Sequence, residues 1–216
     1  MPKLTNYLET HLGNFLEKSR AALGSKGQIP PTTDEIQTLL DYLQSNGLDP
    51  IIVGSIAVYN QLRKISRIST DLIPPTKHLD IAIAKQEIGV TKDLDLFISR
   101  ALPNIPPGWK VDRASIGVPS WISPSRGYVD FLIAGAPLAE NAGIPKQIKK
   151  DPDSEKMGCP IADLQSLFEL KLDSSREKDL LDLLVLAKTV GIPRNLPSLN
   201  ERQRENLEYL MIVKNM

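Results

Sequence analysis

The sequence predicts an α/β fold of the α+β kind, in which helices flank a short mixed sheet and a helical subdomain follows it. Three short apolar segments of strand character predict the sheet, at residues 50–53, 93–98 and 128–134. Apolar residues at helical spacing predict the helices, most clearly at residues 36–43, 163–172 and 176–188. We therefore expect three parts: an N-terminal helix and linker (1–31), a core (32–150) and a C-terminal helical subdomain (151–216).

The composition is that of a globular protein and excludes several classes of function. Of its 216 residues, 41% are hydrophobic and 24% are charged. Basic and acidic residues number 26 each, so the chain is not expected to coat nucleic acid through phosphate neutralisation. Aromatic residues make up only 5%, which argues against a stacking platform for single strands.

The cysteine and histidine content and the absence of long apolar runs bear on compartment. Cys159 is the one cysteine, which suggests a reducing environment, and His11 and His78 are too few for a zinc cluster. No apolar run reaches the length of a membrane span, and the N-terminus does not resemble a signal peptide. We expect a cytoplasmic protein that does not interact with membranes.

The N-terminal elements follow from apolar spacing and capping residues. Apolar residues at helical spacing predict a first helix over residues 4–16, and residues 24–31 are a linker rich in glycine and proline. Thr32 and Glu35 form a capping box for the next helix, which ends at Asn46-Gly47.

The remaining elements alternate between strand and helix. The strand at residues 50–53 runs directly into Gly54-Ser55, and residues 56–64 are expected to be helical. Residues 65–90 contain Pro74-Pro75 and are interpreted as an insertion, and residues 109–116 as a further strand. Beyond Pro137 we expect helices only. These include the pair at residues 163–188, with Ser174 and Glu177 as a capping box, and a last helix from Ser198 to about Val213.

Asp93 and Asp95 are the first candidates for chemistry. Residues two apart in a strand point to the same face, so both carboxylates project together while Leu94 and Leu96 point to the opposite side. Two adjacent carboxylates repel each other unless a cation lies between them, and hard oxygen ligands suit Mg²⁺. The alternative is an exposed strand face that simply carries two aspartates.

Asp130 and Gly54-Ser55 strengthen the first interpretation. Asp130 interrupts an apolar strand, and a buried carboxylate needs a partner. If its strand lies beside that of Asp93, three carboxylates surround a site able to hold two Mg²⁺ ions. Gly54-Ser55 opens a helix after a strand, so its N–H groups and the Ser55 hydroxyl are placed to bind phosphate. Alone, Gly-Ser is a common turn.

Lys171, in the helical pair, is the cation that a solvated surface explains least well. It falls on the apolar stripe of its helix, so it either extends to solvent or points at a negative charge. Arg176 and Lys178 follow at the start of the next helix.

These features, in this order, resemble the nucleotidyltransferase superfamily of the DNA polymerase beta type. Residues 162–188 (ADLQSLFELKLDSSREKDLLDLLVLAK) resemble the helical tail of small prokaryotic members, including abortive-infection and toxin–antitoxin nucleotidyltransferases. The resemblance extends over about residues 36–188. It implies the roles of metal-binding catalytic carboxylates for Asp93, Asp95 and Asp130 and of nucleotide-binding residues for Gly54, Ser55, Lys171, Arg176 and Lys178.

The expected reaction is transfer of a nucleoside monophosphate from an NTP to an acceptor, with release of pyrophosphate. The acceptor is open: an RNA end, a protein hydroxyl or a small molecule. A homodimer or a toxin–antitoxin partner is the assembly that the resemblance suggests. Two alternatives are a non-catalytic nucleotide-binding relative acting as an antitoxin or regulatory partner, and a purely structural interaction protein.

The chain departs from the family in the long interval between Ser55 and Asp93. Asp71 and Asp80 lie nearer the usual position, but each offers a single carboxylate, so we assign the metal site to Asp93 and Asp95.

Overall fold

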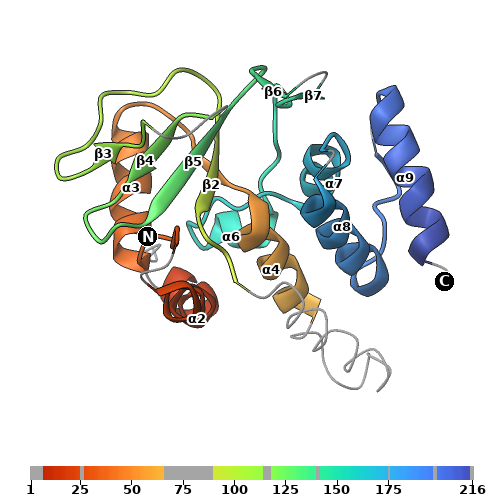
Figure 1. The fold of residues 1–216 in the computed structure, drawn as a ribbon, viewed down its shortest axis with the longest axis horizontal. Helices are drawn as coiled ribbons and strands as arrows, with labels where there is room; N and C mark the ends of the chain where they lie inside the picture. The colour runs from red at the N-terminus through yellow and green to blue at the C-terminus, as the bar shows by residue number, and fades with distance from the viewer. Residues whose placement is uncertain are drawn as a thin grey trace.

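A five-stranded mixed sheet is the main β-structure of the computed structural model (Figure 1). The structure describes residues 7–24, 27–65, 90–113, 118–139, 142–174, 176–196 and 199–214. The strands are β1 (Ile51–Ile52), β2 (Leu94–Ile98), β3 (Lys110–Val111), β4 (Ser120–Ile122) and β5 (Tyr128–Ile133). They lie in the order β1-β2-β5-β4-β3; β2 and β5 are parallel and the other pairs antiparallel. The α+β fold class is therefore confirmed.

The two central strands separate apolar from acidic side chains. Leu94 is in register with Val129 and Leu96 with Phe131, and all four side chains are fully buried. Because side chains alternate along a strand, the residue between each pair points to the other face of the sheet. Asp95 and Asp130 occupy those positions and are also in register with each other. The apolar residues thus fix the register that places two carboxylates side by side.

The N-terminal helices pack beside this sheet. A π-helical segment η1 (Leu8–Gly13) continues into α2 (Asn14–Leu23), so the predicted first helix exists but is longer and changes its winding at Gly13. Helix α3 (Thr33–Ser45) begins at the expected capping box of Thr32 and Glu35. Its apolar stripe is fully buried: Ile36, Leu39, Leu40 and Leu43.

Helix α4 (Gly54–Ile65) connects the sheet to the C-terminal helices (Figure 1). It packs on β2 at one side and on two later helices, α7 (Leu164–Leu172) and α8 (Glu177–Thr189), at the other. The predicted helical pair is confirmed, and α9 (Glu201–Lys214) packs against both of its members. The junction of α7 and α8 lies near Gly54, at the start of α4, and near Asp95 of β2.

The expectation of helices only beyond Pro137 was wrong. A two-stranded antiparallel sheet follows, β6 (Pro137–Ala139) and β7 (Ala142–Gly143), and the short helix α6 (Pro152–Lys156) comes after it. Pro137, Gly143 and Pro145 disfavour helix because proline lacks an N–H donor and glycine costs backbone entropy. Strand β4 was missed because its three residues, with Pro119 before them and Pro124 shortly after, are too few to reveal a period.

The Ser174–Glu177 capping box is also absent. The N-cap of α8 is Arg176, and the Ser174 hydroxyl donates instead to the Asp179 carboxylate, 2.7 Å away. The predicted insertion at residues 65–90 falls almost wholly outside the described residues, as do the rival positions Asp71 and Asp80.

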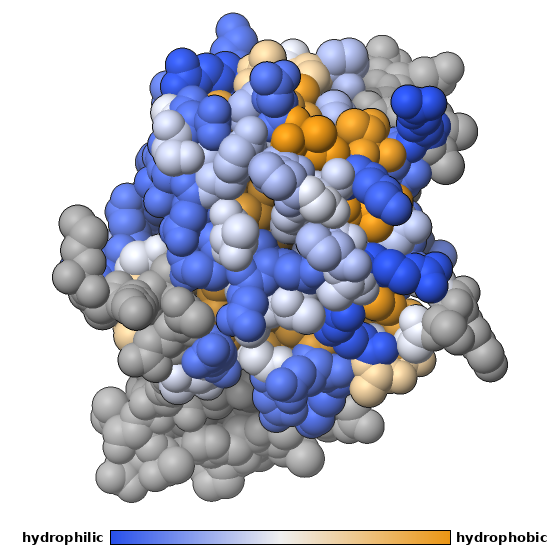
Figure 2. All heavy atoms as spheres, turned by 90° about the vertical axis from the view of Figure 1, so that its left-hand side faces the viewer, coloured by the Kyte–Doolittle hydropathy of each residue, from blue (hydrophilic) through white to orange (hydrophobic). Residues whose placement is uncertain are grey.

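The surface of the molecule is mixed. The face at the left of Figure 1 is mainly hydrophilic, with apolar residues in separated patches (Figure 2). Among the described helices, none combines the length and apolar character needed to cross a lipid bilayer.

Candidate metal and nucleotide site

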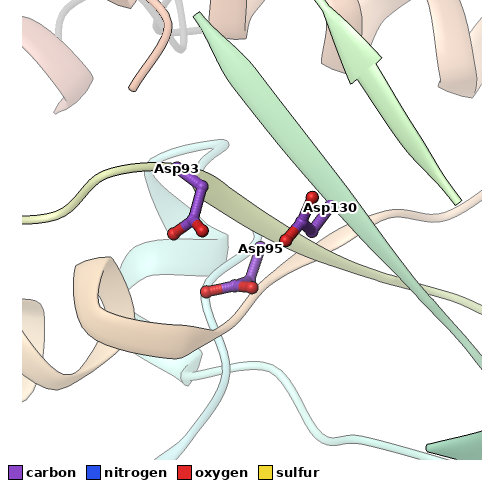
Figure 3. Close-up of side chains that lie close together, drawn as sticks. All are labelled: Asp93, Asp95 and Asp130. Atoms are coloured by element: carbon purple, nitrogen blue, oxygen red, sulfur yellow. The ribbon is translucent and has the colours of Figure 1, made fainter. Parts of the chain in front are cut away.

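Three carboxylates converge at the amino-terminal end of β2 (Figure 3). Asp95 lies in β2 directly opposite Asp130 in β5, and Asp93 immediately precedes β2. One oxygen of each carboxylate lies within 4.8 Å of those of the other two. The predicted convergence of Asp93, Asp95 and Asp130 is therefore confirmed, and all three come from positions on or beside neighbouring parallel strands.

The cluster is electrostatically unfavourable by itself. Asp93 is only 6% exposed, and burial together with the charge of Asp130 raises the pKa of its carboxyl. Asp95 is half-buried; burial, followed by the charges of Asp93 and Asp130, raises its pKa to about 7. Raised pKa values mean that the folded chain resists holding all three groups ionised. A divalent cation would remove that penalty.

The donor set fits a hard divalent cation. Carboxylate oxygens are the ligands that Mg²⁺ prefers, and it binds through one or two carboxylates with water and phosphate oxygens as further ligands. Two-metal sites hold their ions about 3.5–4 Å apart, a separation that oxygens within 4.8 Å of one another can bridge. The residues present therefore match the group that the sequence led us to expect.

Gly54 forms the side of the site opposite β5, for a reason that the sequence did not reveal. Its φ is +65°, a left-handed conformation, and a Cβ placed there would lie 1.9 Å from Oδ2 of Asp95. Glycine is needed at this position because the Asp95 carboxylate occupies the space that a Cβ would take. The adjacent Ser55 side chain is buried, 4% exposed, at the start of α4. The assignment of both residues to phosphate binding stays a prediction.

Lys171 is buried, as its place on the apolar stripe predicted, but it does not lack a partner. Its Nζ lies 2.6 Å from a carboxylate oxygen of Asp179 and 2.6 Å from one of Asp182. Burial alone would lower the pKa of Lys171, but the two carboxylates outweigh it and raise that pKa. The negative charge that Lys171 points at is therefore supplied by the protein itself, and the assignment of Lys171 to nucleotide binding stays a prediction. In this structure Lys171 ties α7 to α8.

Arg176 and Lys178 are the predicted cations that stay exposed. The Arg176 Nε donates to Asp179 at 2.6 Å, while its side chain is 74% exposed. Burial would lower the pKa of Arg176, but the bond to Asp179 and the charges of Asp95 and Asp93 raise it. Lys178 in turn acts to lower the pKa of Asp93. Both cations are thus close enough to the acidic cluster to act on the pKa of its carboxyls.

A small cavity joins the acidic cluster to the helical pair. It has a volume of about 40 Å³ and is lined by residues of the β1–α4 turn, β2, β5 and the α7–α8 junction, among them Gly54, Asp95, Lys171, Ser174 and Arg176. This is room for a few water molecules at most, so a nucleotide does not fit inside it. Lys178 instead lines an apolar groove of about 440 Å³ between α8 and α9.

Sequence reasoning missed two polar partners of the site. Ser120, in the unexpected strand β4, donates a hydrogen bond to Asp130. Lys92 lies 3.8 Å from the Asp93 carboxylate, although 57% of its side chain is exposed. The position of Lys92 beside Asp93 in the sequence was a usable signal, whereas Ser120 becomes a neighbour of Asp130 only through strand pairing.

Comparison of the chain with protein-family models, curated proteins and solved structures finds no match.

Proposed function

We propose that this protein is a metal-dependent nucleotidyltransferase that transfers a nucleoside monophosphate from an NTP to an acceptor. The observation that carries the proposal is the convergence of Asp93, Asp95 and Asp130 at the start of α4. The oxygens offered there suit Mg²⁺, with two ions expected. The resemblance of the Gly-Ser, Asp-x-Asp and later Asp pattern to the polymerase beta type points the same way.

The cations on the opposite side support a phosphate-bearing substrate. The Arg176 side chain is largely exposed, while its Nε is fixed by a hydrogen bond to Asp179. A guanidinium held in this way binds phosphate oxygens with little loss of side-chain freedom. Because the cavity is too small for a nucleotide, the NTP would lie across its opening, between the carboxylates and Arg176. Lys171 contributes by fixing Asp179, and thereby Arg176, rather than by touching phosphate.

The role of each group in the proposed reaction follows from its charge. Bound Mg²⁺ would neutralise the triphosphate and lower the pKa of the attacking hydroxyl. Asp93, Asp95 and Asp130 would hold the reacting groups in line, and Arg176 would stabilise the negative charge of the leaving pyrophosphate. Positioning and electrostatic stabilisation would then supply most of the rate, as in other phosphoryl-group chemistry.

The test is a transfer assay with α-³²P-labelled NTPs. The protein is incubated with Mg²⁺ and each NTP, alone, with total RNA and with candidate acceptor proteins, and label on any acceptor is measured together with pyrophosphate. Asp95→Asn should lower transfer by more than about 100-fold, since even outer-shell changes at metal sites cost 10–100-fold. Asp41→Asn, at an exposed carboxylate of α3, is the matched control and should be fully active.

The outcomes separate this proposal from its two alternatives. Binding of Mg²⁺ and NTP without transfer to any acceptor would indicate a non-catalytic nucleotide-binding relative. Absence of both binding and transfer in the wild type would contradict the proposal and leave an interaction protein.

A further inference from the structure

The serine opposite Asp130 is the feature that the proposed reaction does not yet use. Ser120 lies in β4, directly across the antiparallel β4–β5 pair from Asp130. Its Oγ donates to Oδ1 of Asp130 at 2.5 Å, and a second acceptor, the Val118 carbonyl, lies 3.4 Å away. A hydroxyl carries one hydrogen, so the nearer and charged acceptor receives it.

The backbone holds Ser120 firmly in place. Its carbonyl accepts a hydrogen bond from the Asp112 N–H at 2.8 Å, and the Phe131 N–H donates to the neighbouring Pro119 carbonyl at 2.9 Å. The residue is only 2% exposed, so its hydroxyl cannot reach a ligand in solvent. The contact of Ser120 with the acidic cluster is its hydrogen bond to Asp130.

Asp130 is the carboxylate of the cluster that comes from the second strand. Asp93 lies beside β2 and Asp95 within it, whereas Asp130 lies within β5, next to Ser120 of β4. Figure 3 shows one of its oxygens directed towards Asp95 and the other turned away from it. A hydrogen bond to Oδ1 fixes the plane of the carboxylate and so orients the other oxygen.

We propose that Ser120 is a positioning residue that orients the Asp130 carboxylate for metal binding. The inference rests on the proposed function, because it takes Asp130 as a metal ligand. It goes beyond that function by assigning a role to a strand outside the Gly-Ser and aspartate pattern. Partners of metal ligands typically alter metal affinity or activity by about 10–100-fold when they are removed.

The experiment measures Mn²⁺ affinity of the full chain by electron paramagnetic resonance, with Mn²⁺ replacing Mg²⁺. Ser120→Ala should weaken Mn²⁺ binding by about 10-fold or more, and Ser120→Thr, which keeps the hydroxyl on a residue suited to strands, should restore most of it. Ser123→Ala is the matched control. Ser123 is equally buried and follows the same strand, but its hydroxyl accepts from the Gly127 N–H at 2.8 Å.

A double-mutant cycle separates positioning from a general loss of structure. In an Asp130→Asn background, Ser120→Ala should cause little further loss of Mn²⁺ affinity, because the two residues act as one unit. A merely structural serine would weaken binding equally in both backgrounds. If Ser120→Ala does not fold, Ser120→Cys, a near-isosteric weak donor, takes its place in the cycle.

The outcomes distinguish this inference from the proposed function. Wild-type protein that binds Mn²⁺ while Ser120→Ala binds equally well overturns the role of Ser120 alone. Additive losses in the cycle also overturn it. If the wild-type protein does not bind Mn²⁺, the proposed metal site is contradicted, and so is the role of Ser120 that depends on it.

Discussion

Lys171 shows how a buried charge can be structural although it lies beside a candidate site. Its ammonium pairs with Asp179 and Asp182, and each of the three side chains is at least 94% buried. The pair with Asp179 lowers the pKa of that carboxyl to about 2, against the effect of burial. Removing the lysine leaves two buried carboxylates, of which Asp179 keeps Arg176 and Ser174 as partners.

Lys171→Met should therefore destabilise the protein strongly. Breaking a buried ion pair by removing one partner costs about 3–5 kcal/mol, because the remaining charge stays desolvated. Urea unfolding followed by circular dichroism gives the free energy of unfolding. Lys178→Met, an exposed lysine of α8, is the control and should change it by less than about 0.5 kcal/mol. Equal unfolding midpoints for Lys171→Met and wild type would show that the pair contributes nothing to stability.

The turn from β1 into α4 is the element on which the site depends most. Gly54 combines a positive φ with contact to the Asp95 carboxylate, so a side chain there meets two obstacles. An L-residue in the left-handed region costs about 1–2 kcal/mol, and the Cβ would collide with Oδ2 of Asp95 at 1.9 Å. The carboxylate must then leave its present position in the site.

Gly54→Ala should lower the free energy of unfolding by at least about 2 kcal/mol and abolish Mn²⁺ binding. Gly135→Ala provides the comparison, since Gly135 also has a positive φ, of 73°, but a Cβ added there would lie 4.0 Å from the nearest atom, Cγ of Lys146. This control should show the backbone cost while it retains the metal site. Normal Mn²⁺ binding by Gly54→Ala would mean that Asp95 is not a ligand.

Elements with a clear period were predictable from the sequence, and elements defined by pairing were not. Helix α3, the helical pair and strands β2 and β5 carry regular apolar patterns, and from them the convergence of Asp95 with Asp130 followed. Strand β4 is too short to show a pattern, so the hydrogen bond from Ser120 to Asp130 could not be predicted from the sequence. The alternation of Asp179 and Asp182 with leucines was visible, but their common partner Lys171 emerges only when α7 packs on α8.

At the scale of the whole molecule, two acidic groups titrate in opposite senses. The pKa of Asp95 is raised to about 7 in the folded state, above the usual value of about 3.9, so the folded state binds the extra proton. Its contribution to stability is complete below about pH 4 and is lost as the pH rises through 7. The pKa of Asp179 is lowered to about 2, so its contribution is present above about pH 4 and is lost as the pH falls towards 2.

The metal-free protein should consequently be most stable near pH 4, where both contributions are largely present, and should lose stability on either side. From pH 6 to pH 8.5 we expect a loss of about 1–2 kcal/mol, since one pKa unit corresponds to ~1.4 kcal/mol and half-buried Asp95 is partly screened by solvent. Urea unfolding in EDTA across this range measures the profile.

Asp95→Asn removes the titrating group, so its profile should be flatter above pH 6 and its stability at pH 8 equal to or above that of the wild type. Asp41→Asn should retain the wild-type slope, and saturating Mn²⁺ should abolish that slope in the wild type because it binds the ionised carboxylates. A wild-type profile that is flat from pH 6 to pH 8.5 in EDTA would contradict the raised pKa of Asp95. A large loss of stability in Asp95→Asn at pH 8 would show that the Asp95 carboxylate stabilises the fold.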